Sequence, residues 1–190
     1  MNGQPDLFSP LHDLDLVRLL LADMHDDLYG KVGRFRQLAD LSETFRIGRT
    51  ILPGGETAFA AWSEARTSFI HGNYVATVLL CQGLAEHLLA AHLTMGLNAE
   101  QLPERIQFPE TLRRCVEKNI IPQNIADDLH NLMKMRNPLS HYRDINDPYN
   151  LSRWVLDTMV PVECHLRADA SFAISMAIRL LALPAFNLGG

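Results

Sequence analysis

The chain has 190 residues, of which 47% are hydrophobic and 21% are charged, a composition that excludes both a disordered chain and a lipid-spanning one. At this length we expect one domain, or one domain with an appendage, built around a substantial core. The formal net charge of -5 lies in the first 27 residues, which hold six aspartates and one arginine, so the rest of the chain sums to zero and any basic surface must be local.

The N-terminal segment, residues 1–50, predicts an acidic helical extension. Over 14–28 the leucines recur at helical spacing and the aspartates fall on the opposite side, and a second helix is expected over 32–46. The stretch "ILPGGET" at 51–57 follows, with one proline and two glycines together. It is the clearest linker in the sequence.

A helical hairpin is predicted after this linker. Apolar residues share one stripe over 58–70, and the turn at 71–73 contains a glycine where a helix is expected to stop. The next helix, 74–95, is apolar on nearly every side and therefore predicts the central element of a bundle. Gln82 and Glu86 interrupt it, so a membrane span is not expected.

The second half of the chain also reads as helices. Asp147 and Pro148 provide a plausible N-cap and first residue for one of them. The predicted fold class is all-α, an antiparallel helical bundle over 56–183 with the extension before it and a tail over 184–190 after it. The helices expected here cover 111–118, 123–136, 148–159 and 167–183.

The sequence "MRNPLSHYR" at 135–143 is the main candidate site. Because Pro138 lacks an N–H and disfavours helical backbone before it, we expect a helix to end at Arg136. Asn137 would then cap a new helix that holds His141 in its opening turns. Such a helix start attracts phosphate and would keep the imidazole neutral, able to act as a base. The alternative is a plain helix junction, with Arg136 satisfying terminal carbonyls.

Glu86 lies on an apolar face of the predicted central helix. A buried carboxylate is costly without a cationic or hydrogen-bonding partner. Arg136 is the expected partner, because its guanidinium can bind a carboxylate with one edge and keep other donors free. The alternatives are a Glu86 side chain that reaches solvent, or one that pairs with Arg66.

A short basic patch surrounds the motif. Lys134, Arg136 and Arg143 bring three positive charges and no acid to ten residues. Lys134, Ser140 and Arg143 are therefore candidate substrate-binding residues. The alternative is a solvated helix end.

The hairpin "WSEARTSFIHGNYVATVLLCQGLAEHLL" followed by "MRNPLSHYR" resembles the HEPN superfamily of all-helical domains over about residues 58–146. Arg136, Asn137 and His141 match its arginine, polar residue and histidine, and Glu86 matches its acidic residue. The resemblance implies a metal-independent endoribonuclease without a cofactor, whose site forms across a homodimer. It also implies RNA as substrate, with an antitoxin or regulatory protein as a possible partner in a toxin or defence system.

The expected reaction is attack of a ribose 2′-hydroxyl on the adjacent phosphate. His141 would move the proton and Arg136 would stabilise charge on the phosphoryl oxygens. Asn137 would orient the histidine or the phosphate, and Glu86 would hold Arg136. One chain offers one such histidine, so acid and base together would need a homodimer.

Two other readings stay open. One is a non-catalytic module that binds nucleotide, RNA or a protein, and the order of helices and loops around 105–142 has a weaker likeness to the mannitol operon repressor family, which implies a transcriptional regulator. The other is a structural dimer whose acidic N-terminal helix docks on a basic partner.

The remaining chemistry-bearing residues predict packing. Three cysteines lie far apart without a CxxC pair, and two tryptophans and a tyrosine fall at helical core spacings. His87 and His92 do not share a helix face, so no metal site is expected. No basic stretch followed by an apolar core begins the chain, so we expect a cytoplasmic protein without a secretory signal. The predicted packing residues are Cys81, Cys115, Cys164, Trp62, Tyr74 and Trp154.

Overall fold

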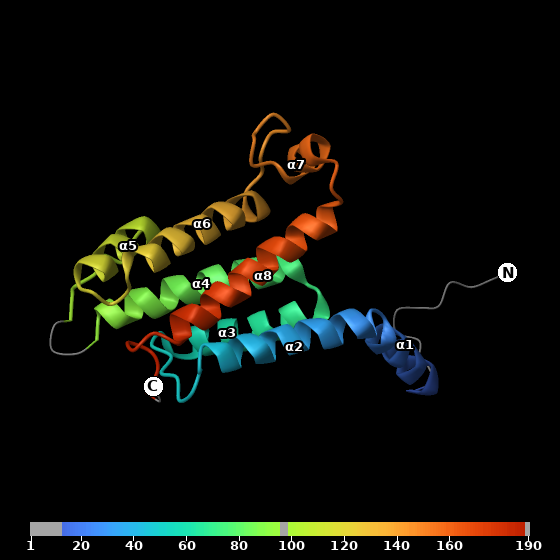
Figure 1. The fold of residues 1–190 in the computed structure, drawn as a ribbon, viewed down its shortest axis with the longest axis horizontal. Coiled ribbons are helices and arrows are strands. Elements are labelled where there is room, and N and C mark those ends of the chain that lie inside the picture. The colour runs from blue at the N-terminus through green and yellow to red at the C-terminus, as the bar shows by residue number, and fades with distance from the viewer. Residues whose placement is uncertain (1–12, 96–98, 189–190) are drawn as a thin grey trace.

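A computed structural model describes residues 13–95 and 99–188, which form an all-α bundle of packed helices (Figure 1). The predicted fold class is confirmed, while the predictions that fall on 1–12 and 189–190 lie outside the described residues. The helices are α1 (Asp13–His25), α2 (Leu28–Thr44), α3 (Gly55–His71), α4 (Tyr74–Leu93), α5 (Phe108–Glu117), α6 (Gln123–Ser140), α7 (Leu151–Thr158) and α8 (Val162–Leu181).

Helix α4 is the centre of the bundle and contacts α3, α5, α6 and α8. Its leucines Leu84, Leu88 and Leu89 are completely buried, as the all-round apolar pattern predicts. Among the described residues α4 is also the one helix long and apolar enough to cross a membrane by length and composition. Half of its apolar window is buried inside the protein, so the core accounts for this composition.

The α3–α4 hairpin forms where the sequence predicts it. Gly72 ends α3 in the left-handed conformation, with φ +80°, and its N–H donates to the carbonyl of Phe69. This geometry favours glycine because a Cβ would be strained there. The chain re-enters a helix at Tyr74, so α3 and α4 lie side by side as antiparallel neighbours (Figure 1).

Helix α2 belongs to the packed bundle although it lies within the predicted extension. It contacts α3 and α8, and it places Leu38 in the core. Arg34 is buried at the α3–α4 turn, where Nε donates to the Ile70 carbonyl at 2.9 Å and Nη2 pairs with Asp27 at 2.8 Å. A division of the chain near residue 50 stays a prediction, but the packing of α2 joins the two sides.

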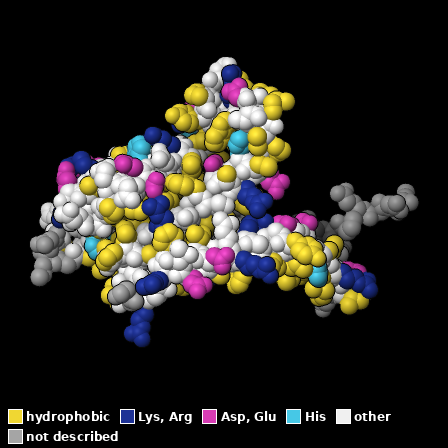
Figure 2. All heavy atoms as spheres, viewed as in Figure 1, with side chains coloured by type: hydrophobic (Ala, Val, Ile, Leu, Met, Phe, Trp, Pro, Cys, Tyr) yellow, Lys and Arg dark blue, Asp and Glu magenta, His cyan; other side chains and the backbone are white. Residues whose placement is uncertain are grey.

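Helix α1 projects from the bundle and is the acidic helix that the sequence predicts. The chain turns at Asp27, which adopts a positive φ of 51°, so the predicted 14–28 helix stops at His25. The leucines of α1 are exposed, for example Leu19 at 63% and Leu20 at 62%. Figure 2 shows hydrophobic side chains gathered at this end of the molecule.

The C-terminal segment returns to the core. Phe186 is fully buried, and the N–H of Leu188 donates to the Arg49 carbonyl at 2.9 Å. Thr50 and Asn187 form an isolated antiparallel bridge. The described part of the predicted tail over 184–190 is therefore packed against the chain before α3.

Helix α7 begins three residues later than the sequence predicts. Asn150 is its N-cap, and the Asn150 side chain accepts hydrogen bonds from the N–H groups of Ser152 and Arg153. Asp147, the predicted cap, instead closes a turn by accepting from the N–H of Tyr149 at 2.8 Å. The prediction was wrong because two side chains in this loop are able to cap, and Asn150 also donates to the Arg143 carbonyl.

The cysteines divide by position. Cys81 and Cys115 are buried in the core, and burial raises the pKa of the Cys115 thiol to about 12. Cys164, near the start of α8, is exposed, so the packing prediction was wrong for this residue.

Candidate functional site

Helix α6 continues through the motif. It ends at Ser140, with Pro138 inside it and His141 as the C-cap in extended conformation. The predicted break at Arg136, the N-cap at Asn137 and the new helix around His141 are wrong. The helix continues because Leu139, one residue after the proline, packs against the core cluster, and this packing stabilises one further turn.

The end of α6 therefore has the opposite electrostatic character from the one predicted. A helix C-terminus exposes carbonyl groups and a partial negative charge, whereas phosphate favours a helix N-terminus. Ser140 Oγ lies 3.3 Å from the carbonyls of both Arg136 and Asn137, and the His141 N–H donates to the Asn137 carbonyl. No anion cradle of backbone N–H groups forms at this corner.

The two main residues of the motif stand on different kinds of backbone. Arg136 lies within α6, whereas His141 follows the last helical residue in an extended conformation, so helical periodicity does not fix the direction of its side chain. Lys134 and Asn137 are three positions apart on α6 and share one face, and Arg136 leaves the helix on another face. Arg136 and His141 therefore share no helical face.

Glu86 is not the partner of Arg136. It is half-buried, and it accepts a hydrogen bond from Gln82 Nε2 at 3.0 Å. Helix α6 runs antiparallel to α4 (Figure 1), so Arg136 lies toward the start of α4 while Glu86 lies in its second half. Glu86 borders a separate cavity between α4 and the segment before α5. The predicted ion pair was wrong because a neighbour on α4 itself satisfies the carboxylate.

The basic patch is smaller than the sequence predicts. Arg143 pairs with Asp147 at 3.0 Å, so an acid just beyond residues 134–143 neutralises one of the three positive charges. Lys134 is exposed and Arg136 is half-buried, and neither forms an ion pair with any residue in 13–95 or 99–188. His141 is exposed and has no side-chain partner within the same residues.

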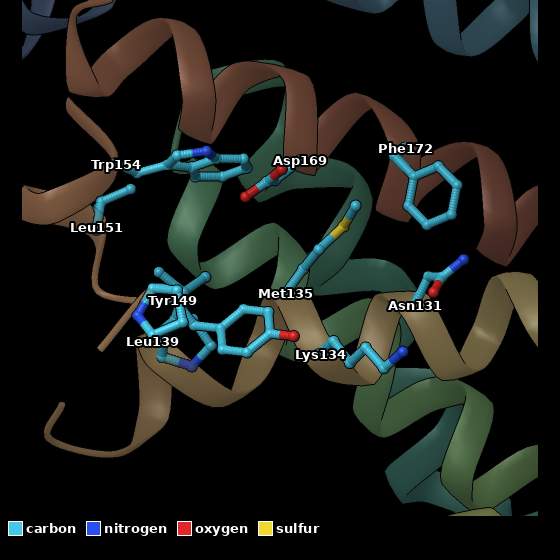
Figure 3. Close-up of a pocket in the computed structure, with 11 residues that line it drawn as sticks. Asn131, Lys134, Met135, Leu139, Tyr149, Leu151, Trp154, Asp169 and Phe172 are labelled. Atoms are coloured by element: carbon cyan, nitrogen blue, oxygen red, sulfur yellow. The ribbon is translucent and has the colours of Figure 1, made fainter. Parts of the chain in front are cut away.

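A cavity of about 370 Å³ opens beside this end of α6, between α6, the loop before α7, α7 and α8. This volume falls within the range of small-molecule sites. Figure 3 shows the apolar and aromatic side chains that surround it. They are Met135, Pro138, Leu139, Pro148, Tyr149, Leu151, Trp154 and Phe172.

Asp169 is the acidic group of this cavity. Its carboxylate points inward between Trp154 and Phe172 (Figure 3), and the residue is only 8% exposed. It accepts no hydrogen bond from any described residue. Burial raises the pKa of Asp169 to about 6, and His165 one turn earlier opposes this rise. Asn131 and Lys134 supply the other polar groups of the lining.

The sequence did not predict this cavity. Trp154, expected as a packing residue, is 42% exposed and stacks on the His165 ring with centroids 4.7 Å apart. His165 Nε2 in turn lies 2.9 Å from Thr158 Oγ1. The signal in the sequence was Asp169, a carboxylate within the apolar run of the last helix. Like Glu86, it lies on an apolar helix face, where burial without a partner is costly.

No group of three histidine, cysteine or acidic side chains gathers closely enough to hold a metal ion in the part of the chain that the structure describes. Comparisons with protein-family models, with curated proteins and with solved structures found no match to this chain.

Proposed function

We propose that this protein is a non-catalytic helical module whose side chains, and not the carbonyl end of α6, bind the phosphates of RNA along one stripe. The observation that supports this proposal is a stripe made by Lys134 and Asn137 on one face of α6 and by the exposed His141 just after the helix, none of which has an acidic partner among the described residues. Phosphate contacts from such side chains give binding that depends on salt and little on sequence.

The proposal excludes Arg136 from the main contact. Arg136 leaves the helix on another face, so an RNA strand along the stripe does not need it. A regulator of the kind implied by the likeness to mannitol operon repressors would use the same surface without turnover. Homodimer formation and a cytoplasmic location remain predictions from the sequence.

Binding is tested with a fluorescein-labelled 20-nucleotide single-stranded RNA and a chelator, at several salt concentrations. Lys134→Ala should weaken binding and reduce the salt slope by about 1. Arg36→Ala is the matched control, because Arg36 is an exposed cation of α2 without an ion-pair partner among the described residues. Binding that Lys134→Ala and His141→Ala leave unchanged would contradict the proposal.

A HEPN-type ribonuclease, with a role in a toxin or defence system, is the second candidate. The observation that favours it is the motif itself, since the Arg136 and His141 side chains are not engaged elsewhere in the described chain. Because one chain offers one such histidine, acid and base together would need a homodimer that brings two copies of the motif face to face.

One incubation of RNA with the protein and a chelator distinguishes the two candidates. Cleavage in the presence of chelator that is lost in both Arg136→Ala and His141→Ala would establish the ribonuclease and replace the binding module. Intact RNA, bound by wild type and by Arg136→Ala but weakly by Lys134→Ala, would support the binding module.

A further inference from the structure

We propose that the cavity between α6, α7 and α8 binds a small organic cation, an ammonium, amidinium or guanidinium group carried on a flat apolar body. This site shares Lys134 with the RNA-binding stripe, but it does not depend on RNA binding because Asp169 lies outside the stripe. Its recognition group is the carboxylate of Asp169, and its walls are the rings of Trp154, Tyr149 and Phe172 (Figure 3).

The first step of the argument is a carboxylate that opens into the cavity and has no hydrogen-bond or ion-pair partner among the described residues. Buried carboxylates in folded proteins are paired with a cation or hydrogen-bonded, because the loss of hydration is costly. Asp169 is more than nine-tenths buried and has no hydrogen-bond donor from the described chain, although its carboxylate faces open space. A ligand that brings N–H donors and a positive charge would satisfy it.

The second step is the shape and lining of the cavity. Trp154 and Phe172 flank the carboxylate, and Met135 and Leu139 close the α6 side. Aromatic faces attract cations, and methionine adapts to flat apolar groups. A buried acid among mostly apolar walls is the complement of a hydrophobic amine or amidine, and the cation of the lining, Lys134, is exposed.

The third step is the construction of α7, which covers one side of the cavity. It has no buried residue, and among the other described helices its main contacts are to α8. Its Trp154 is held in place by stacking on His165. Lys134 lines the opposite side but is exposed, so its ammonium is free to turn to water when a cation enters.

The test uses three compounds of nearly the same shape: 2-naphthamidine as the cation, 2-naphthamide as the neutral isostere and 2-naphthoate as the anion. Binding to the full chain is measured by calorimetry at pH 7.5. We expect 2-naphthamidine to bind at least tenfold more tightly than the amide, and naphthoate to bind weakest. A charge-assisted hydrogen bond corresponds to a factor of roughly 10 to 100 in affinity.

Asp169→Asn should lower the affinity for 2-naphthamidine by at least tenfold and leave the affinity for 2-naphthamide within about twofold. Glu163→Gln, an exposed carboxylate on the same helix, is the matched control and should change neither. Trp154→Ala should weaken binding of both compounds, which locates them in the cavity even if Asp169→Asn alters the fold.

Equal affinity for cation and amide, equal losses in Asp169→Asn and Glu163→Gln, or no binding of 2-naphthamidine at 5 mM would each overturn the proposal. Two variants separate this result from the RNA experiment: Arg136→Ala and His141→Ala lie outside the lining of the cavity and should bind 2-naphthamidine as wild type does, whereas Lys134 belongs to both surfaces.

Discussion

At the scale of single residues, Arg34 shows how one buried cation joins helices distant in the sequence. Its Nε donates to the Ile70 carbonyl, Nη1 lies 3.3 Å from the Tyr74 hydroxyl and Nη2 pairs with Asp27. The guanidinium also stacks over the Tyr74 ring, 5.8 Å from its centroid. The Arg34 side chain lowers the pKa of Asp27, which is consistent with an ionised pair.

Arg34→Ala is expected to lower the free energy of unfolding by about 2 to 4 kcal/mol, because it leaves the Ile70 carbonyl and the Tyr74 hydroxyl without their donor. Arg34→Lys should recover only part of this loss, since an ammonium lacks the fixed fork of donors. Urea denaturation measures the change, with Arg36→Ala on the exposed face of α2 as control. A loss for Arg34→Ala no larger than that of the control would contradict this role.

Asp169 is expected to make the stability of the protein depend on pH. Because the folded pKa of about 6 exceeds the ordinary value of 3.8, the folded state holds its proton more tightly than the unfolded state. The associated stability is present below pH 4 and is lost as pH rises through 6. The charged or titratable groups near Asp169 are His165 on its own helix, Lys134 on α6 and Tyr149 in the loop.

Asp169→Asn should therefore be more stable than wild type at pH 7, by on the order of 1 to 3 kcal/mol, and the gain should shrink as pH falls from 6 to 4. Thermal unfolding from pH 4 to 7.5 measures both curves. A constant offset across this range would show that titration of Asp169 does not cause the difference.

At the scale of elements, the last turn of α6 depends on tertiary packing that opposes local preference. Pro138 removes the N–H that would bond the Lys134 carbonyl, at a cost of about 3 kcal/mol inside a helix. Leu139 packs against the core cluster just beyond it, and apolar burial stabilises the turn. The turn persists because the second effect offsets the first.

Pro138→Ala is expected to stabilise the protein by about 1 kcal/mol, since the alanine N–H can restore the hydrogen bond to the Lys134 carbonyl. The greater conformational freedom of the unfolded variant opposes part of this stabilisation. Leu139→Ala should do the reverse and cost about 2 kcal/mol, as expected for a partly buried leucine. Guanidinium denaturation compares the two. Destabilisation by Pro138→Ala would show that the proline ring itself contributes packing that the helix needs.

The same elements show what can be predicted from the sequence. The α3–α4 hairpin follows from local signals, namely helical apolar spacing and a glycine at the expected helix stop, and Gly72 has the positive φ that such a stop uses. The end of α6 was not predicted from the sequence, because the contact that stabilises it joins Leu139 to distant parts of the chain. The cavity was not predicted either, because its lining comes from α6, α7 and α8 and no single segment contains its pattern.

At the scale of the whole molecule, the N-terminal end presents apolar and acidic side chains together. Leu16, Leu20 and Met24 are exposed on α1, and Leu28 continues the surface on α2. Figure 2 shows this hydrophobic region beside the bundle. These side chains contribute little to the folded chain by itself, whereas Leu38, further along α2, is 4% exposed and belongs to the core.

This contrast gives a test of the predicted homodimer. Leu16→Gln together with Leu20→Gln should change the free energy of unfolding by less than about 0.5 kcal/mol, because both side chains are exposed, whereas Leu38→Ala should cost about 2 to 5 kcal/mol. If α1 mediates self-association, sedimentation velocity will show wild type and Leu38→Ala as dimers and the double variant as a monomer. A double variant that stays dimeric would place the dimer contact elsewhere. A double variant as unstable as Leu38→Ala would show that α1 packs on the bundle in solution.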